Sequence, residues 1–380
     1  MNVTGYGLIL PLLPFFADNL GASPLTIGIF LSTFHFFAML AGPFLGEFSD
    51  KFGRKPILLI STAGTTIGFL LLGVAQTLPL LFLARIIDGI SAGNTSTARA
   101  VIADITPKDK RVSKLGFTFA AESLGLIAGP LIGGFFSQSG FTVSAYIAAL
   151  IAALAFILTL LVLPETKDFS QQSTVVKNKS GINLGEVFKA LRNTKIRTYI
   201  LVIFVVQFLI MVMWGTLALY GKHFFGFTGK EMGYISAFAA TVGILSQVIL
   251  LNILLKLIKE KAILILGLSI MCLGMIFLGV SGVVAVLLIG VGLMAMSFNI
   301  LMPTVTGLAS ELSSEDDQGR LMGTISSTTF LGSLTGPVVG NAIYSLSMRG
   351  NYFFGAVVAL SAALSSIKGI KTQRILNKES

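Results

Sequence analysis

Residues 46–56 read GEFSDKFGRKP, and this polar stretch separates two long apolar blocks at about 25–46 and 56–76. Gly53 suits a tight turn in which the backbone needs a positive φ. Asp50 and Arg54 flank this glycine, where they can pair across the turn. Pro56 is suited to the first turn of the helix that follows. The stretch therefore predicts a tight, charged connection between two apolar helices.

The composition around this stretch is that of a membrane protein. Hydrophobic residues make up 54% of the 380 residues and charged residues only 12%, whereas soluble domains carry about 25% charge. The apolar residues form about a dozen blocks, most of them roughly as long as the 20 residues that a helix needs to cross a bilayer. The blocks are continuous rather than alternating, which disfavours a membrane barrel. We therefore expect an all-α polytopic membrane protein.

The apolar blocks predict about 12 transmembrane helices. We place them near residues 1–17, 25–46, 56–76, 79–104, 115–137, 141–163, 197–221, 231–255, 262–280, 282–310, 320–345 and 351–370. The first block is short for a membrane span. We expect either a first helix that is shortened at its start or an initiation site further upstream.

Basic residues give the chain a net charge of +10, but their distribution argues against nucleic-acid binding. Lys and Arg gather in alternate loops and in the C-terminal tail, which is the positive-inside pattern of membrane proteins. The loops that this pattern assigns to the cytoplasm lie around residues 47–55, 105–114, 164–196, 256–261 and 311–320. We expect a multi-pass protein of the plasma membrane with a cytoplasmic C-terminus, whose partner is the lipid bilayer.

An internal repeat divides the chain into two halves. The positions Gly116, Gly125, Gly129, Pro130 and Gly133 recur 207 residues later as Gly323, Gly332, Gly336, Pro337 and Gly340. Both copies cross the membrane in the same direction, so the repeat is parallel, and halves of this kind usually enclose a site near the midplane. We predict an N-terminal six-helix half at 1–163, a cytoplasmic linker at 164–196, a C-terminal six-helix half at 197–371 and a cytoplasmic tail at 372–380.

The linker carries a helical pattern of its own. Leu184, Val187, Phe188 and Leu191 follow the spacing of one helical face. This spacing favours a short amphipathic helix on the inner membrane surface. The alternative is a mobile linker.

Charged residues inside the apolar blocks are the candidates for function, because a charge in the membrane is costly and usually faces a cavity or a partner. Arg85 and Asp88 lie three residues apart, on one helical face. Asp88 is either a titratable coupling site or the counter-ion of Arg85. Glu122 is a second intramembrane acid, with a hydrogen-bonded packing role as its alternative.

These segments resemble the major facilitator superfamily. The stretch at 46–56 resembles its connection between helices 2 and 3, where the family's Asp and Arg form a charge network with an acid at the inner end of helix 4. The resemblance implies that this network latches the outward-facing state. The corresponding residues here are Gly46, Asp50, Gly53, Arg54 and Asp104.

Two further segments carry the resemblance. The run from Arg85 to Gly93 is similar to the family's helix 4 pattern, whose Arg is linked to proton transfer, so Arg85, Asp88 and Glu122 become candidates for proton coupling. The helix 5 segment resembles the signature of proton-coupled antiporters; its residues are Gly116, Gly125, Gly129, Pro130, Gly133 and Gly134. Residues 5–14 resemble the helix 1 pattern, but Asn2 stands where that pattern has an acid.

The combination most resembles the tetracycline and multidrug efflux group. It implies proton-driven export of a small, largely apolar compound by alternating access, through a fold of two parallel six-helix halves, in a protein that we expect to be monomeric. The alternative is a symporter or facilitator for a metabolite such as a sugar or an organic acid. Polar and aromatic candidates for the substrate cavity are Asn2, His35, Gln207, Trp214 and Asn299.

The sequence offers no sign of enzymatic chemistry. A phosphate-binding loop is missing, which argues against direct use of ATP, and no nucleophile elbow is present. Cys272 is the single cysteine, so neither an intrachain disulfide nor a cysteine metal cluster is expected. We expect no enzyme, no cofactor and no metal site.

Overall fold

The computed structural model describes residues 1–92, 94–107, 110–166, 184–192, 196–313 and 317–379, and these are helical throughout apart from short connections. Nine helices in this described part are long and apolar enough to cross a membrane. These spans are Pro24–Phe52, Arg54–Val74, Gly116–Ser139, Phe141–Val162, Arg197–Phe225, Gly229–Leu257, Glu260–Val280, Val284–Ser310 and Gly350–Ile367. The chain is an all-α polytopic membrane protein, as the sequence predicts.

The other three predicted membrane helices are interrupted or polar. Residues 1–17 form α1 (Asn2–Ile9), the 3₁₀ turn η1 (Leu10–Leu12) and α2 (Leu13–Asn19), because Pro11 and Pro14 disturb a continuous α-helix. The predicted helix at 79–104 is divided into α5 (Leu78–Ile90) and α6 (Asn94–Ile105). The predicted helix at 320–345 lies within α15 (Gln318–Leu346), which is rich in Ser, Thr and Gly.

The helices gather into two compact units, which are described separately. The first comprises Met1–Gly181 and Gly221–Ala237, and the second comprises Ile182–Tyr220 and Phe238–Ser380. The predicted division into two six-helix halves with a linker rests on sequence symmetry, and it stays a prediction.

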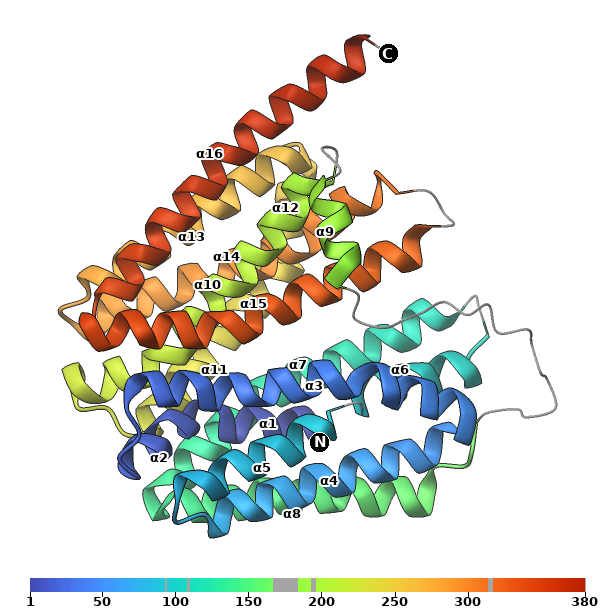
Figure 1. The fold of residues 1–380 in the computed structure, drawn as a ribbon, viewed down its shortest axis with the longest axis vertical. Coiled ribbons are helices and arrows are strands. Elements are labelled where there is room, and N and C mark those ends of the chain that lie inside the picture. Colours follow the sequence, from blue (N-terminus) through green and yellow to red (C-terminus); the bar gives the residue numbers. More distant parts are fainter. Residues whose placement is uncertain (93, 108–109, 167–183, 193–195, 314–316, 380) are drawn as a thin grey trace. The chain divides into compact units, whose positions relative to one another are not determined.

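The first unit is a helical bundle (Figure 1). After α1 and α2, it contains α3 (Pro24–Phe52), α4 (Arg54–Val74), α5, α6, α7 (Arg111–Phe136), η3 (Ser137–Ser139) and α8 (Phe141–Val162). The π-helical turn η4 (Gly221–Phe225) and the start of α11 (Gly229–Leu245) also belong to it. Helix α3 begins after Ser23, whose hydroxyl accepts the Thr26 N–H at 3.2 Å, with Pro24 in the first turn.

The second unit also consists of helices. It contains α9 (Leu184–Arg192), α10 (Arg197–Tyr220), the rest of α11, η5 (Ser246–Leu250) and α12 (Leu251–Leu257). It continues with α13 (Glu260–Val280), α14 (Val284–Ser310), α15 and α16 (Gly350–Glu379). Helix α10 packs against α14, α15 and α16, and α13 packs against α14 and α16.

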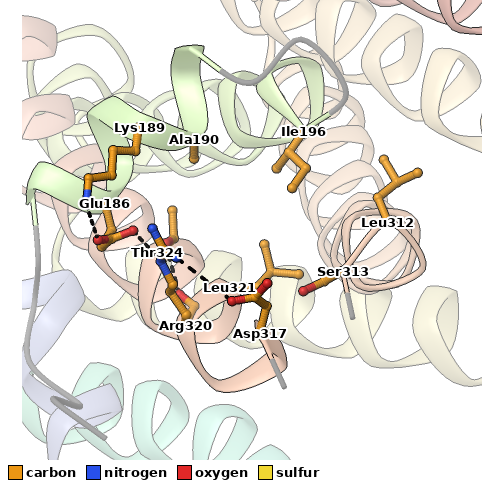
Figure 2. Close-up of a pocket in the computed structure, with 10 residues that line it drawn as sticks. All are labelled: Glu186, Lys189, Ala190, Ile196, Leu312, Ser313, Asp317, Arg320, Leu321 and Thr324. Atoms are coloured by element: carbon orange, nitrogen blue, oxygen red, sulfur yellow. Dashed lines mark hydrogen bonds and ion pairs between the residues drawn. The ribbon is translucent and has the colours of Figure 1, made fainter. Parts of the chain in front are cut away.

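Helix α9 lies within the predicted linker and is held by charges (Figure 2). Glu186 accepts hydrogen bonds from Lys189 at 3.0 Å and from Arg320 of α15 at 2.5 Å. Arg320 first, and then Lys189, lower the pKa of the Glu186 carboxyl. Val187 is buried while Phe188 of the same predicted face is 66% exposed. Of these two residues on the predicted apolar face, Val187 is thus buried within the second unit, whereas Phe188 is exposed.

The internal repeat of the sequence corresponds to the same helix–helix contact in each unit. In the first unit α7 packs on α1, and in the second α15 packs on α10. A Cβ on Gly129 would meet the Thr4 carbonyl oxygen, and a Cβ on Gly336 would meet the Met211 side chain. Gly129 and Gly336 are 207 positions apart, and so are Thr4 and Met211. The repeat therefore holds for the partner helix as well as for the glycine-rich one.

Gly129→Ala should destabilise the protein by about 1–3 kcal/mol, because the added methyl group forces α7 away from α1. The midpoint of thermal unfolding of the purified full chain in detergent measures this loss. Gly116→Ala is the matched control on the same helix, since a Cβ there meets nothing within 4 Å. Equal losses in both variants would show that close backbone approach is not what the Gly129 position requires.

Candidate functional site in the first unit

The predicted latch residues meet at one end of the first unit. Arg54, at the start of α4, places Nη1 2.5 Å from Asp50 Oδ1 and Nε 2.9 Å from Asp104 Oδ2. It also donates to the Ser49 hydroxyl at 3.1 Å. The Arg54 side chain is only 16% exposed. The charge network joins α3, α4 and α6, although Asp104 is 50 residues away in sequence.

Glu165 is a further member of this cluster, and the sequence analysis did not identify it. Its carboxylate accepts the backbone N–H groups of Arg54 at 2.8 Å and of Lys55 at 3.1 Å. It therefore caps the N-terminus of α4, where unpaired N–H groups and the helix dipole favour an anion. The only signal in the sequence is an acid shortly after the end of the sixth apolar block.

The two predicted latch glycines, Gly53 and Gly46, differ in backbone conformation and in the space around them. Gly53 has a φ of 107°, and a Cβ there would collide with the Glu165 carboxylate. Glycine is required at this position by both backbone conformation and space. A Cβ on Gly46 meets nothing within 4 Å, and nothing in the structure explains a glycine there.

Arg85 and Asp88 form a buried ion pair inside α5. Arg85 Nη1 lies 2.9 Å from Asp88 Oδ2, and the two side chains are 1% and 4% exposed. The Arg85 guanidinium carbon lies 4.4 Å from the centre of the Phe34 ring and 6.0 Å from that of Tyr6. The Nε and Nη2 atoms of Arg85 find no hydrogen-bond acceptor in the described part of the chain. A charge held this deeply depends on its single counter-ion.

Glu122 is also paired, with a residue to which the sequence analysis gave no role. Arg99 Nη2 donates to Glu122 Oε2 at 2.8 Å and to Oε1 at 3.1 Å, which joins α6 to α7. The side chains are 40% and 21% exposed, so this pair is more accessible than Arg85–Asp88. The signal for Arg99 is a cation within an apolar block, which is uncommon enough to predict a partner.

The helix 5 signature is mainly a packing surface. Cβ atoms on Gly125, Gly129 and Gly133 would meet Thr4 and Leu8 of α1, and a Cβ on Gly134 would meet Gly233 of α11. Pro130 lies inside α7, and a Cβ on Gly7 would come within 3.3 Å of its ring. Gly116 has open space around it. The signature thus places α7 against α1 on one side and against the start of α11 on the other.

The predicted substrate-cavity residues are divided between the two units, and each is described in its own unit. His35 is half-buried, edge-on to Phe34 at 5.3 Å between ring centres, and therefore near Arg85. In the second unit, Gln207 is buried and donates to Ser333 of α15 at 2.8 Å. Asn299 donates to the Ala295 carbonyl at 2.9 Å, and Trp214 is half-buried on α10. The side chain of Asn2 lies outside what the structure describes.

Comparison with known families shows the family of the chain. The family model described as the Major Facilitator Superfamily matches residues 1–299 and, in a second match, residues 225–374. The chain belongs to the major facilitator superfamily. It is accordingly an integral, multi-pass membrane transporter of the secondary type and not an enzyme.

Two relatives within this superfamily are similar over most of their length. The class E tetracycline resistance protein of Escherichia coli is 29% identical, over 91% of this chain and 85% of that protein. Multidrug resistance protein 1 of Bacillus subtilis (strain 168) is also 29% identical, over 95% of this chain and 92% of that protein.

Solved transporter structures share the fold. The human organic anion transporter MFSD10 (TETRAN) superposes with a TM-score of 0.68 at 22% identity and covers 96% of both chains. A D-xylose–proton symporter superposes with a TM-score of 0.75 at 17% identity, over 96% of this chain and 94% of that one. At these identities the likeness concerns the major facilitator fold alone.

Glu165→Gln should weaken the cap of α4 and lower the free energy of unfolding by about 0.5–2 kcal/mol, as the loss of an N-cap does. Thermal unfolding of the purified protein measures the effect. Glu47→Gln is the matched control, because Glu47 is an exposed acid near the end of α3. If the two variants unfold at the same temperature, the Glu165 cap contributes nothing measurable.

Proposed function

We propose that the chain is a proton-coupled exporter of a small, largely apolar, drug-like compound. It works by alternating access, as a monomer in the plasma membrane with its C-terminus in the cytoplasm. The observation that carries the proposal is the Arg85–Asp88 pair, with both charges almost wholly buried inside a membrane protein. Burying ionisable groups in a membrane protein costs free energy. Where such groups occur, they commonly mark ion or proton pathways.

The geometry of the pair supplies a means of coupling. When Asp88 takes up a proton, Arg85 keeps its charge at 1% exposure without its counter-ion. Such an unpaired buried charge costs several kcal/mol. A rearrangement that brings water or another acceptor to Arg85 relieves this cost. Protonation of Asp88 therefore favours a second conformation, and conformations that differ in proton affinity are what an antiporter needs.

The Arg99–Glu122 pair gives a second acid with a different exposure. Glu122 is 21% exposed, whereas Asp88 is 4% exposed. Glu122 is thus better placed to exchange a proton with water, and Asp88 to change the conformation. Each acid lies within hydrogen-bond distance of an arginine. We assign proton coupling to these two pairs, with Asp50, Arg54 and Asp104 as the conformational latch and with Gly129 and Pro130 as the α1–α7 seal.

The direction and the substrate class rest on two observations. The two relatives described above, which align over more than nine-tenths of this chain, are a tetracycline resistance protein and a multidrug resistance protein, which favours export of a drug-like compound. The rings of Phe34 and Tyr6 lie against the buried arginine, and His35 packs edge-on against Phe34. Aromatic side chains beside a few polar groups suit a largely apolar ligand.

Asp88→Asn should abolish substrate-triggered proton release, and Glu122→Gln should slow it by at least about tenfold, the effect of losing roughly 1.4 kcal/mol of transition-state stabilisation. Inside-out vesicles with an imposed proton gradient are given a panel of cationic dyes, tetracyclines and quinolones. A fluorescent pH indicator then records proton movement. The Glu47→Gln variant keeps the full response because its carboxyl is exposed near the end of α3 and belongs to neither ion pair.

Two results would contradict the proposal. Export that continues unchanged after a protonophore has collapsed the gradient would exclude proton coupling. A wild-type protein that is correctly inserted but releases no protons with any compound of the panel would favour the metabolite symporter or facilitator instead.

A further inference from the structure

A second charged cluster lies at the end of the first unit opposite to Arg54. Lys222, in η4, places Nζ 2.6 Å from Asp18 Oδ2 and 2.8 Å from the side-chain oxygen of Asn19. His223 Nε2 lies 3.7 Å from the same Asp18 oxygen. Helix α3 separates this end from the latch, since it runs from Pro24 beside α2 to Phe52 beside Arg54.

Closely packed glycines hold the Lys222 segment in place. A Cβ on Gly229 would collide with Leu12 and Ser137, and a Cβ on Gly233 would collide with the Pro130 carbonyl and Gly134. Residues 221–237 are therefore fitted tightly to η1, to η3 and to the end of α7, within the first unit.

A cavity lies beside the Asp18–Lys222 pair. Its volume is about 260 Å³, and residues from α2, η3, α8 and the 222–229 segment line it. The principal lining residues are Phe15, Phe16, Phe141, Phe227, Lys222 and Thr228. Phe16 and Phe141 are stacked, with ring centres 3.9 Å apart and planes 13° from parallel. We call this cavity the aromatic vestibule.

The chemistry of the lining selects a class of ligand. The four phenylalanine rings provide flat apolar walls, which favour an aromatic compound. Among the described residues that line the vestibule, only Lys222 is charged, and it is already paired with Asp18, so an ionic ligand gains little. The Lys222 ammonium has three N–H groups, and Asp18 and Asn19 accept two of them. The third can reach an uncharged acceptor such as a ketone oxygen.

We propose that the aromatic vestibule binds neutral aromatic compounds that carry a hydrogen-bond acceptor, and that a bound compound holds residues 221–229 against α2. Binding itself is independent of the proposed function. The consequence of binding rests on that function. If the transporter must open this end to release substrate, the bound compound inhibits transport. Added substrate does not relieve this inhibition.

Benzophenone is a suitable probe, because it is neutral, aromatic and a ketone. On irradiation its oxygen takes a hydrogen atom from a nearby C–H bond, and the two carbon radicals join, so the adduct carries the whole mass of the probe. The full-length protein in lipid nanodiscs is irradiated at increasing probe concentrations. Mass spectrometry of its peptides then locates the adducts.

We expect saturable adducts within residues 12–19 and 137–141. Phe141→Leu and Lys222→Met should each reduce them by about twofold to tenfold, as expected for the loss of one aromatic or charged contact. Phe135→Leu is the matched control, because Phe135 lies on α7, is 62% exposed and is not part of the vestibule lining. This variant should be labelled like the wild type.

Labelling that rises linearly with probe concentration, spreads over lipid-facing residues and is equal in the Phe141→Leu and Phe135→Leu variants would overturn the proposal. The readout needs no transport, so a protein that binds the probe but moves no protons would contradict the proposed function and leave the vestibule site intact. A protein that releases protons normally but is labelled without saturation would contradict the vestibule site and leave the proposed function intact.

Discussion

The packing of α7 on α1 is the constraint on which the rest of the first unit depends. In lipid, apolar side chains gain little by meeting each other, so helices associate through close packing of small residues. Gly125, Gly129 and Gly133 bring α7 so near that any side chain would strike α1. On its other side, Gly134 meets Gly233 of α11 in the same way. Helix α7 therefore sets the position of α1, and with it of Tyr6 beside Arg85.

The low dielectric of the membrane explains why the charges of this unit occur as pairs. A single buried charge is costly, so every charge that the sequence places in an apolar block needs a partner. Asp88 finds Arg85 one helical turn away on the same helix, whereas Glu122 finds Arg99 on the neighbouring one. Arg85 and Asp88 move together because both lie on α5. Any movement of α6 against α7 separates Arg99 from Glu122. The two acids therefore differ in what their protonation can change, and not only in their exposure.

Local patterns in the sequence predicted the parts of the fold that depend on local physics. The length of the apolar blocks predicted the membrane helices, and the spacing of the glycines predicted an internal repeat. The structure shows this repeat as two helix pairs, α7 on α1 and α15 on α10. The network of Asp50, Arg54 and Asp104 came from resemblance to a family, because nothing local brings Asp104 to Arg54. Glu165 and the Arg99–Glu122 pair were missed for that reason, since each depends on tertiary packing. The division between α5 and α6 was missed because small residues such as those after Ile90 also occur within continuous membrane helices.

The coexistence of two charged clusters at opposite ends of one unit bears on how the latch works. If an intact Asp50–Arg54–Asp104 network required the opposite end to be open, the Lys222 segment would not be seated on α2 in the same structure. Both arrangements are present together, with Arg54 bound to both acids and Lys222 bound to Asp18. An intact network and a Lys222 segment seated on α2 are therefore compatible within the first unit. The network joins α3, α4 and α6, and Glu165, which follows α8, binds the start of α4. The network thus connects three helices of the first unit, and its role as a conformational latch stays a prediction, which requires that its partners separate when the unit moves.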